Sequence, residues 1–323
     1  MLQHDKSIHI LGVPLDLGLS KLGADMGPTA LRYAGLYQAF DYAGFKYEDH
    51  GDLDVLKNFT LDRLPVQERN KKRFDEIIRV SDQLAHFVNK IASSGGFPLT
   101  LGGDHSTSIG SIAGLAKAYE RLGVIWIDAH PDANTPDTSP SGNVHGMPLA
   151  TSLGHGYKEL THCLGFAPKV RYEDVCIVGA KDIDPEELEF LRNHDVCMYT
   201  TFDIQDMGIG PVIRQAVERV GKHTDAVYVS FDADAMDMNL APGTGIMTRG
   251  GLGYREISYI MEYIGRNVTL AGVDMIELNP LMDKRNATAE LCVELLMSLL
   301  GVRYSDYEKS YLPDNQWENG NDE

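Results

Sequence analysis

The sequence predicts an α/β fold that forms one domain around a mainly parallel β-sheet. Short apolar runs alternate along the chain with stretches of helical periodicity, which is the pattern of βαβ units. The 323 residues contain neither a Pro/Gly/Ser-rich linker between two cores nor an internal repeat. A chain of this length can bury one large core. We therefore expect a single domain over residues 1–303, followed by a polar, acidic tail over residues 304–323.

Short apolar runs predict the strands, and longer amphipathic stretches predict the helices. The strands are expected near residues 7–13, 45–49, 98–101, 123–128, 174–179, 195–200, 226–232 and 269–276. The clearest helix spans residues 70–94, where Ile77 and Leu84 share one face and a Gly-Gly pair follows as a stop. The other helices are expected over residues 107–121, 185–194, 209–221, 254–265 and 286–300.

The composition disfavours several classes of protein. A formal net charge of -18 is unsuited to nucleic acid or to an anionic membrane, because both partners need clustered Lys and Arg. The four cysteines show no Cys-x-x-Cys spacing, which predicts reduced thiols in a cytoplasmic protein. Neither a signal-peptide pattern nor an apolar run long enough to cross a bilayer is visible. A small molecule is therefore the expected partner.

The last residues, 304–323, are expected to be disordered or to form a subunit contact. The segment is rich in polar and acidic residues, which favours disorder. Its Tyr307, Tyr311 and Trp317 favour the alternative of a contact between subunits.

Asp and His side chains alternate where several of the expected strands end. Residues i, i+2 and i+4 of an extended segment point the same way, so Asp128, His130 and Asp132 can converge on one point. In open α/β sheets, ligands bind in the crevice at the carboxyl ends of the strands. These positions therefore predict a metal site at that edge of the sheet. The candidate ligands are His105, Asp128, His130, Asp132, Asp232 and Asp234.

The chemistry of this set indicates which metal it holds. Any one of these residues alone is more often a helix cap or a packed core residue, but so many buried carboxylates would repel one another without cations. A carboxylate-rich set without thiolates favours manganese or magnesium over zinc, and we choose manganese. Six ligands exceed what one catalytic ion takes with an open position, so we expect two ions bridged by Asp groups and a solvent molecule. The bridging hydroxide would be the nucleophile of a hydrolase.

Several segments together resemble the ureohydrolase family. The most specific are residues 101–106 (Leu-Gly-Gly-Asp-His-Ser), 126–134 (Trp-Ile-Asp-Ala-His-Pro-Asp-Ala-Asn) and 230–234 (Ser-Phe-Asp-Ala-Asp). The likeness covers most of the chain and leaves only the tail outside. It implies a three-layer α/β/α fold around a parallel sheet of about eight strands and a binuclear manganese cluster. It also implies hydrolysis of a C–N bond in a linear guanidinium or amidine, by a homo-oligomer that is a trimer or a hexamer.

Residues 134–148 resemble the matching loop of bacterial-type arginases within that family. The resemblance implies that Asn134, Ser139 and Ser141 hydrogen-bond the α-carboxylate of the substrate and that Asp184 approaches its α-amino group. An ordinary Ser/Pro/Gly-rich surface loop is the alternative. A site built to hydrogen-bond a substrate group rejects an analogue that lacks it by roughly 10⁴ to 10⁵. The loop therefore favours L-arginine over agmatine, which lacks the carboxylate.

The resemblance also implies catalytic roles. His145 matches a proton shuttle, Glu277 matches the carboxylate that pairs with the substrate guanidinium, and Asp128 accepts a hydrogen bond from the bridging hydroxide. Glu187 matches a residue that contacts the substrate through water. An exposed loop histidine and a helix-capping carboxylate are the alternatives for His145 and Glu277.

The expected function is manganese-dependent hydrolysis of L-arginine to L-ornithine and urea. The alternatives are hydrolysis of agmatine, guanidinobutyrate or formiminoglutamate, and a catalytically silent binding protein of the same family. The chain departs from the usual family sequence at Ala233, at Met238 and over residues 246–249. These departures bear on loop packing, metal affinity and fine specificity, whereas the candidate ligands and the expected reaction class are unchanged.

Overall fold

The computed structural model describes residues 6–19, 21–247 and 249–302. The predicted tail over 304–323, with Tyr307, Tyr311 and Trp317, lies outside the described residues, and so does Thr248.

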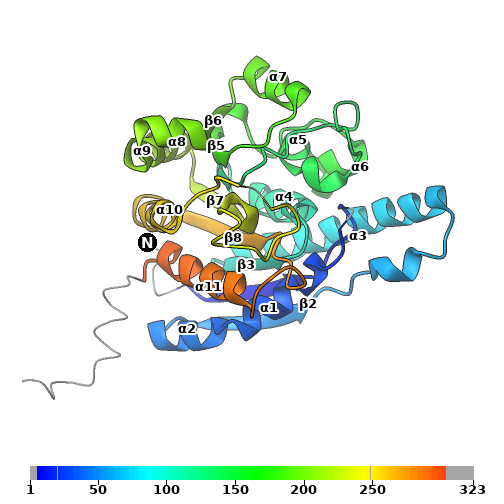
Figure 1. The fold of residues 1–323 in the computed structure, drawn as a ribbon, viewed down its shortest axis with the longest axis horizontal. Coiled ribbons are helices and arrows are strands. Elements are labelled where there is room, and N and C mark those ends of the chain that lie inside the picture. The colour runs from blue at the N-terminus through cyan, green and yellow to red at the C-terminus, as the bar shows by residue number, and fades with distance from the viewer. Residues whose placement is uncertain (1–5, 20, 248, 303–323) are drawn as a thin grey trace, which may run out of the picture.

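An eight-stranded sheet, counted over the described residues, forms the middle layer of the molecule (Figure 1). Its spatial order is β2-β1-β3-β8-β7-β4-β5-β6, and every neighbouring pair is parallel. The strands are β1 (Ile8–Val13), β2 (Tyr47–Asp52), β3 (Phe97–Gly102), β4 (Leu122–Ile127), β5 (Val175–Ala180), β6 (Cys197–Thr200), β7 (Ala226–Asp232) and β8 (Leu270–Ile276). The predicted α/β class and the predicted strand positions are confirmed, with small shifts at the strand ends.

Helices cover both faces of the sheet and complete three layers. One apolar core joins the sheet to α1 (Gly27–Tyr33), α2 (Leu36–Ala43), α8 (Thr201–Met207), α9 (Ile209–Gly221), α10 (Tyr254–Asn267) and α11 (Ala287–Leu299). The core on the opposite face joins it to α3 (Val66–Ser93), α4 (Ser108–Ala118), α5 (Pro148–Ser152), α6 (Lys158–Thr161) and α7 (Pro185–Asn193). Within the part of the chain that the structure describes, no helix is both long and apolar enough to cross a membrane.

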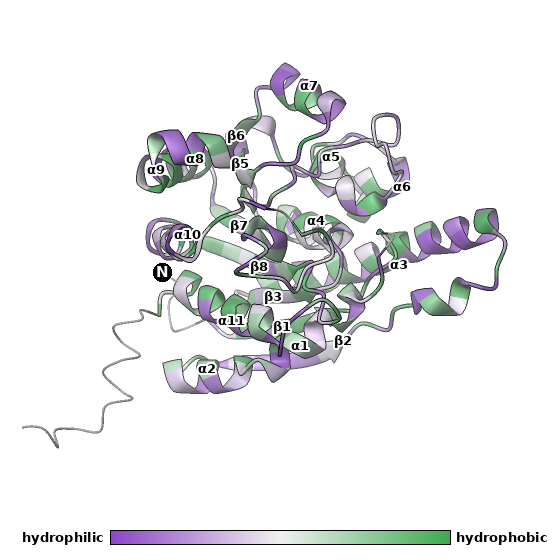
Figure 2. Cartoon of the chain, viewed as in Figure 1, coloured by the Kyte–Doolittle hydropathy of each residue, from purple (hydrophilic) through white to green (hydrophobic). Residues whose placement is uncertain are grey.

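Alternating side chains of each central strand enter the two cores. Ile125 of β4 and Val229 of β7 face the first core, whereas their neighbours Trp126 and Tyr228 face the second, and all four are fully buried. A parallel sheet covered on both faces needs apolar side chains on both, which explains the continuous apolar runs in the sequence. The helices carry hydrophilic and hydrophobic residues side by side, as expected for elements with one face on a core (Figure 2).

The helix prediction differs from the structure in two respects: short helices were missed, and one long helix begins earlier than predicted. The short helices α1, α2, α5, α6 and α8 were not predicted, because one or two turns are too short to show a 3.6-residue period. The long helix α3 begins at Val66, earlier than predicted, after Pro65 as its N-cap. Its first turn is mostly polar and largely exposed, and its one apolar residue, Val66, faces solvent, so no apolar repeat marks it.

The order of the strands decides which loops meet. The four adjacent strands β3, β8, β7 and β4 lie at the centre of the sheet, and their carboxyl ends and the loops that follow contain the predicted metal ligands and Glu277. Residues far apart in sequence are thereby brought to one edge.

The contact between α10 and α11 gives a testable prediction for the fold. A Cβ atom at Gly265 would lie 2.1 Å from the backbone oxygen of Leu299, whereas one at Gly221, at the end of α9, would meet nothing within 4 Å. We expect Gly265→Ala to lower the free energy of unfolding by about 1–3 kcal/mol through overpacking. Gly221→Ala should leave it unchanged or raise it, because alanine favours helix. Chemical denaturation of both variants checks this, and equal stability would contradict the close approach.

Candidate metal centre and active site

The six predicted metal ligands converge at the carboxyl edge of the sheet. Two groups of three among these six ligands place one ligand atom each within 4.8 Å of one another: His105, Asp128 and Asp232 form the first, and Asp128, His130 and Asp234 the second. Asp128 belongs to both groups, so its carboxylate can bridge two ions. The sixth predicted ligand, Asp132, places an oxygen 2.8 Å from His105 Nδ1.

The surroundings of His105 fit a metal ion better than a hydrogen bond. Its Nδ1 atom lies 3.0 Å from Asp128 Oδ2, 2.8 Å from Asp132 Oδ2 and 3.1 Å from Asp232 Oδ2, yet none of these contacts has hydrogen-bond geometry. A ring nitrogen carries at most one proton and cannot satisfy three carboxylates. A cation among these four atoms would satisfy all of them, because imidazole nitrogen and carboxylate oxygen are both metal ligands.

Neighbouring residues fix the orientation of the ligands. His105 Nε2 lies 2.8 Å from Ser230 Oγ. With the ring proton on Nε2 in this contact, the lone pair of Nδ1 is left for a metal. The His105 ring stacks on Trp126, with ring centres 4.0 Å apart. Trp126 Nε1 in turn donates to Asp128 Oδ2 at 3.0 Å, and the backbone N–H of His130 donates to Asp128 Oδ1 at 2.7 Å. The fully buried Asp128 is therefore held from both sides.

Crowding of negative charge perturbs the carboxylates. Burial, together with the charges of neighbouring aspartates, raises the pKa of Asp132 and of Asp232 and brings the pKa of Asp234 to about 6. Asp128 differs, since contacts with His105 and His130 outweigh its burial and lower its pKa. A divalent cation would stabilise all four ionised carboxylates at once, which is a second reason why the donor set fits a metal.

The backbone at the site is strained. Asp132 has φ 51° and Glu277 has φ 58°, values in the left-handed region that non-glycine residues seldom adopt. Gly103, just before the His105 loop, packs so tightly that a Cβ atom would lie 1.8 Å from the backbone oxygen of Leu15. The backbone of Gly103 also accepts the N–H of Glu277 at 2.8 Å. The scaffold thus forces ligands and neighbours into conformations that they would not adopt alone.

A cavity of about 200 Å³ opens above the ligands. It brings together every predicted site residue except His105 and Asp128, which lie buried beneath it. Its lining residues are His130, Asp132, Asn134, Ser139, Ser141, His145, Gly146, Asp182, Asp184, Glu187, Asp232, Asp234, Ile246 and Glu277.

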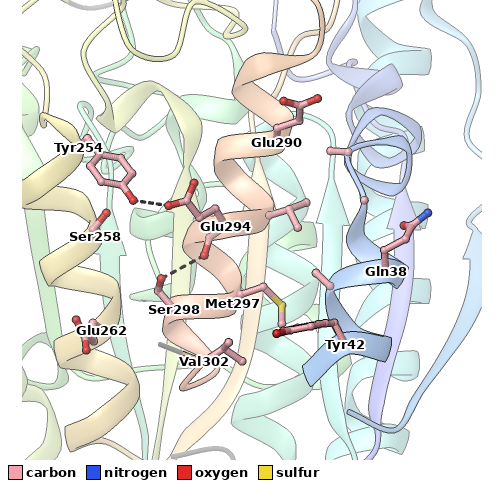
Figure 3. Close-up of a pocket in the computed structure, with 14 residues that line it drawn as sticks. Gln38, Tyr42, Tyr254, Ser258, Glu262, Glu290, Glu294, Met297, Ser298 and Val302 are labelled. Carbon is pink, nitrogen blue, oxygen red and sulfur yellow. Dashed lines mark hydrogen bonds between the residues drawn. The ribbon is translucent and has the colours of Figure 1, made fainter. Parts of the chain in front are cut away.

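A larger hollow of about 410 Å³ lies elsewhere, among α2, α10 and α11 (Figure 3). Of the described residues that line it, none lines the cavity at the ligands and none is a histidine. Because it lacks the ligand set, it is not the candidate active site.

The outer rim of the site cavity offers hydrogen-bond donors. Ser139 Oγ accepts the N–H of Gly142 at 3.0 Å and Ser141 Oγ accepts the N–H of Asn143 at 3.2 Å. The two hydroxyl oxygens lie 3.5 Å apart, so one hydroxyl can donate to the other while the hydrogen of the second remains as a donor. The amide of Asn134 donates to Asp184 Oδ2 at 2.8 Å and keeps a second N–H. These groups suit a carboxylate.

Glu187 lines the cavity and also contacts the backbone of two neighbouring segments. Its carboxylate is buried and accepts the backbone N–H of Ala133 at 2.7 Å and that of Asp184 at 3.3 Å, where it completes a capping box at the start of α7. Burial raises the pKa of Glu187 to about 8. Glu187 therefore ties the loop after β4 to α7, in addition to lining the cavity.

His145 and Glu277 form a pair beside the ligands. Glu277 Oε1 accepts the backbone N–H of His105 at 2.8 Å and lies 3.2 Å from His145 Nδ1. Burial opposes protonation of His145, but the contact with Glu277 outweighs it and raises the pKa to about 9. The side chains of His145 and Glu277 are 13% and 4% exposed, so neither residue is an ordinary surface group.

Sequence reasoning missed part of the surroundings. Asp182 and Ile246 line the cavity, and Ser230, Trp126 and Asp104 orient the ligands or their loops. Ser230 precedes Asp232 by two residues, so the same alternation that identified the aspartates could have identified it. Asp104 accepts the N–H of Gly18 at 2.7 Å, a contact between distant segments that no local pattern reveals.

The parallel sheet and the buried carboxylate and imidazole groups at its carboxyl edge define a metal-dependent hydrolase. The family model described as "Arginase family" matches residues 6–301. The chain therefore belongs to the arginase family, whose members are ureohydrolases that act on linear amidines.

Known relatives cover almost the whole chain. It is 43% identical to the arginase of Brevibacillus brevis over 92% of this chain and 98% of that one. The crystal structure of Bacillus caldovelox arginase superposes with a TM-score of 0.88 and 42% identity, over 93% of this chain and 99% of that one. Formimidoylglutamase of Bacillus subtilis shares the fold, with a TM-score of 0.71 at 23% identity, over 92% of this chain and 87% of that one.

Asp128 belongs to both groups of ligands, which gives a prediction for metal binding. We expect Asp128→Asn to lose bound divalent metal and urea release together, because a neutral amide bridges two cations poorly. Asp137→Asn, at an exposed loop position, serves as the matched control and should keep both. Elemental analysis of the desalted proteins measures the metal. Full metal content with normal activity in Asp128→Asn would exclude the bridging role.

Proposed function

We propose that this protein hydrolyses L-arginine to L-ornithine and urea with two manganese ions per subunit. The observation that carries the proposal is one cavity with two ends of different chemistry. Its base holds the His/Asp clusters and Glu277, and its rim carries Asn134, Ser139 and Ser141. An amino acid with a guanidinium at the far end of its side chain complements both ends. The relatives named arginase support this choice of substrate.

The donor set supports manganese. His105 and His130 supply two nitrogens against the oxygens of four aspartates, a balance that suits a harder ion than zinc. When bound, the two ions would supply a water-derived nucleophile near neutral pH and polarise the carbon that it attacks.

Glu277 is proposed to orient the substrate guanidinium. Its Oε1 atom accepts the backbone N–H of His105 and contacts His145. Its Oε2 atom lies on the side of Gly245, 3.6 Å from where a Cβ atom added to that glycine would be. A carboxylate pairs with a planar guanidinium through parallel hydrogen bonds. Glu277 would thereby hold the guanidinium carbon over the clusters.

His145 is proposed to move the proton that the leaving amine needs. Collapse of a tetrahedral intermediate breaks a C–N bond, and the departing nitrogen of ornithine must be protonated as it leaves. His145 lines the cavity and contacts Glu277, which favours the imidazolium form. It can donate a proton and recover one from solvent through the cavity mouth.

The rim residues are proposed to select the amino-acid end of the substrate. Asn134, Ser139 and Ser141 would donate to the α-carboxylate, and Asp184 would accept from the α-ammonium group. Glu187 supports this end of the site, because it fixes Asp184 and the backbone at Ala133. Specificity would then arise from groups left unpaired when a substrate lacks its carboxylate.

We also infer a cytoplasmic enzyme that assembles as a homo-oligomer, a trimer or a hexamer. The four free cysteines suit a reducing compartment. The family resemblance supports the assembly, which light scattering of the purified protein would measure.

A panel of substrates tests the function. Manganese-loaded protein should release urea from L-arginine with a kcat/KM at least about 10⁴ times that for agmatine or guanidinobutyrate. Formiminoglutamate should give no measurable product. Faster turnover of agmatine than of arginine would contradict the proposal and indicate an agmatinase. No turnover of any guanidino compound by metal-loaded protein would indicate a catalytically silent binding protein.

Substitution of the two rim serines tests the proposed contacts with the substrate α-carboxylate. We expect the double variant Ser139→Ala, Ser141→Ala to lower kcat/KM for arginine by roughly 100-fold, through loss of hydrogen bonds to a charged group. The residual rate with agmatine should not change, because agmatine offers these hydroxyls no carboxylate. Manganese content serves as the control for an intact site. An equal loss with both substrates would show that the serines act only through the shape of the loop.

A further inference from the structure

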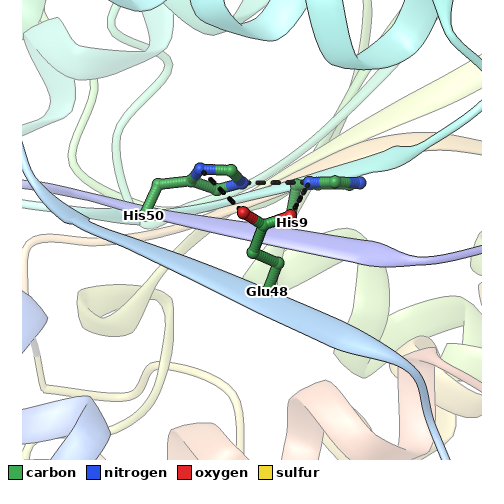
Figure 4. Close-up of side chains that lie close together, drawn as sticks. All are labelled: His9, Glu48 and His50. Atoms are coloured by element: carbon green, nitrogen blue, oxygen red, sulfur yellow. Dashed lines mark hydrogen bonds and ion pairs between the residues drawn. The ribbon is translucent and has the colours of Figure 1, made fainter.

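Three side chains outside the active site form a second group with metal-ligating chemistry. They are His9 on β1 and Glu48 and His50 on β2, and Figure 4 shows them pointing toward one another across the two strands. One ligand atom from each lies within 4.8 Å of the others. None of them lines the active-site cavity or takes part in the proposed reaction.

The pairing of the strands creates this group. In the parallel register, His9 lies opposite Glu48. Glu48 and His50 are two residues apart on β2, so their side chains leave the same face of the sheet. β2 is the first strand in the sheet order, an edge strand, and His9 and His50 are only partly covered, with side-chain exposures of 17% and 26%. The group is therefore accessible from solvent while its backbone is fixed by the sheet.

Two of the three separations between the ligand atoms match those of a shared ion, and the third is no more than 4.8 Å. His9 Nδ1 lies 3.0 Å from His50 Nε2 and 3.7 Å from Glu48 Oε2. Two atoms that each lie about 2 Å from one zinc ion are at most about 4 Å apart, and both separations satisfy this limit. In the absence of a metal, the two nitrogens can share one proton as a hydrogen bond, which a cation would replace.

The protein holds both imidazoles in place. The His50 ring packs edge to face on Phe87 of α3, with ring centres 5.0 Å apart, and stacks with the His9 ring at 5.2 Å. The Cδ2 and Nε2 edge of the His9 ring lies against Gly96, so closely that a Cβ atom added at Gly96 would be 2.8 Å from His9 Cδ2. That contact turns Nδ1 toward His50 and Glu48. Preorganised ligands of this kind lose little conformational entropy when an ion binds.

We propose that His9, Glu48 and His50 form a surface site for a borderline divalent cation such as Zn²⁺, which links edge strand β2 to β1. Two imidazoles and one carboxylate favour zinc, nickel or cobalt over the harder ion suited to the aspartate-rich active site. Three protein ligands leave a position for water or for a group from another molecule. The bound ion would fasten the edge strand by a contact that depends on metal concentration.

Zinc binding to manganese-loaded protein tests this site. Wild-type protein kept in excess manganese should bind about one zinc ion more per chain than His50→Ala, by elemental analysis after equilibrium dialysis. Zinc should also raise the Tm of the wild type more than that of His50→Ala. His9→Ala should behave like His50→Ala, and Glu48→Gln should weaken zinc binding by at least about tenfold.

A matched control separates this site from others. His86→Ala removes an exposed histidine on α3 that lies outside the group, and it should bind zinc as the wild type does. Zinc that replaces manganese in the active site would be bound equally by all variants. Equal zinc content and an equal shift of Tm in wild type, His9→Ala and His50→Ala would overturn the proposal. Urea release by His50→Ala without zinc should match the wild type, which keeps this test independent of the proposed reaction.

Discussion

The structure depends on the concentration of negative charge around Asp128. Four aspartate carboxylates and two imidazoles meet in the interior at the carboxyl edge of the sheet, where burial penalises every ionised form. Histidine alone does not resolve this, because His105 Nδ1 faces three carboxylate oxygens with at most one proton. Added positive charge relieves this repulsion, and a site that favours cations is the first requirement of metal-assisted hydrolysis.

The scaffold assembles these groups by topology and holds them by contacts outside the ligand set. Adjacent strands β3, β8, β7 and β4 contribute one loop each, so four distant segments share one edge. Trp126 and Ser230 fix the ligands from within the sheet, and the positive φ angles of Asp132 and Glu277 show that the loops accept strain to aim their carboxylates. Such strain persists only where packing over-determines the conformation. Gly103 provides that packing, since its backbone touches the Leu15 segment and accepts the N–H of Glu277.

Sequence alone could predict what depends on local periodicity. The buried strands were recognisable because both faces of each central strand are apolar, and the ligands because Asp128 to Asp132 and Asp232 to Asp234 alternate at strand ends. Short helices such as α1 and α2 escaped, because their stability comes from packing on the sheet rather than from a repeat. Contacts between segments also escaped. The links from Asp104 to Gly18 and from Glu187 to the backbone of Ala133 join distant segments and follow from the strand order, which a single sequence does not state.

The position of Glu187 couples specificity to chemistry. The loop after β4 carries a metal ligand at Asp132 and a rim residue at Asn134 only two positions later, and between them the backbone of Ala133 is held by Glu187. The same carboxylate caps the helix that begins after Asp184, which in turn accepts from Asn134. The groups proposed to sense the α-carboxylate and α-amino ends therefore belong to one rigid unit with part of the metal centre. A substrate that fails to engage the rim leaves the donors there unpaired, and the cost falls on the unit that also positions the reacting groups. In such an arrangement, substitutions in the rim loops can change which substrate is bound while the fold stays the same. The reason is that the strand ends hold the groups for the reaction, whereas the loops hold the groups that recognise the substrate.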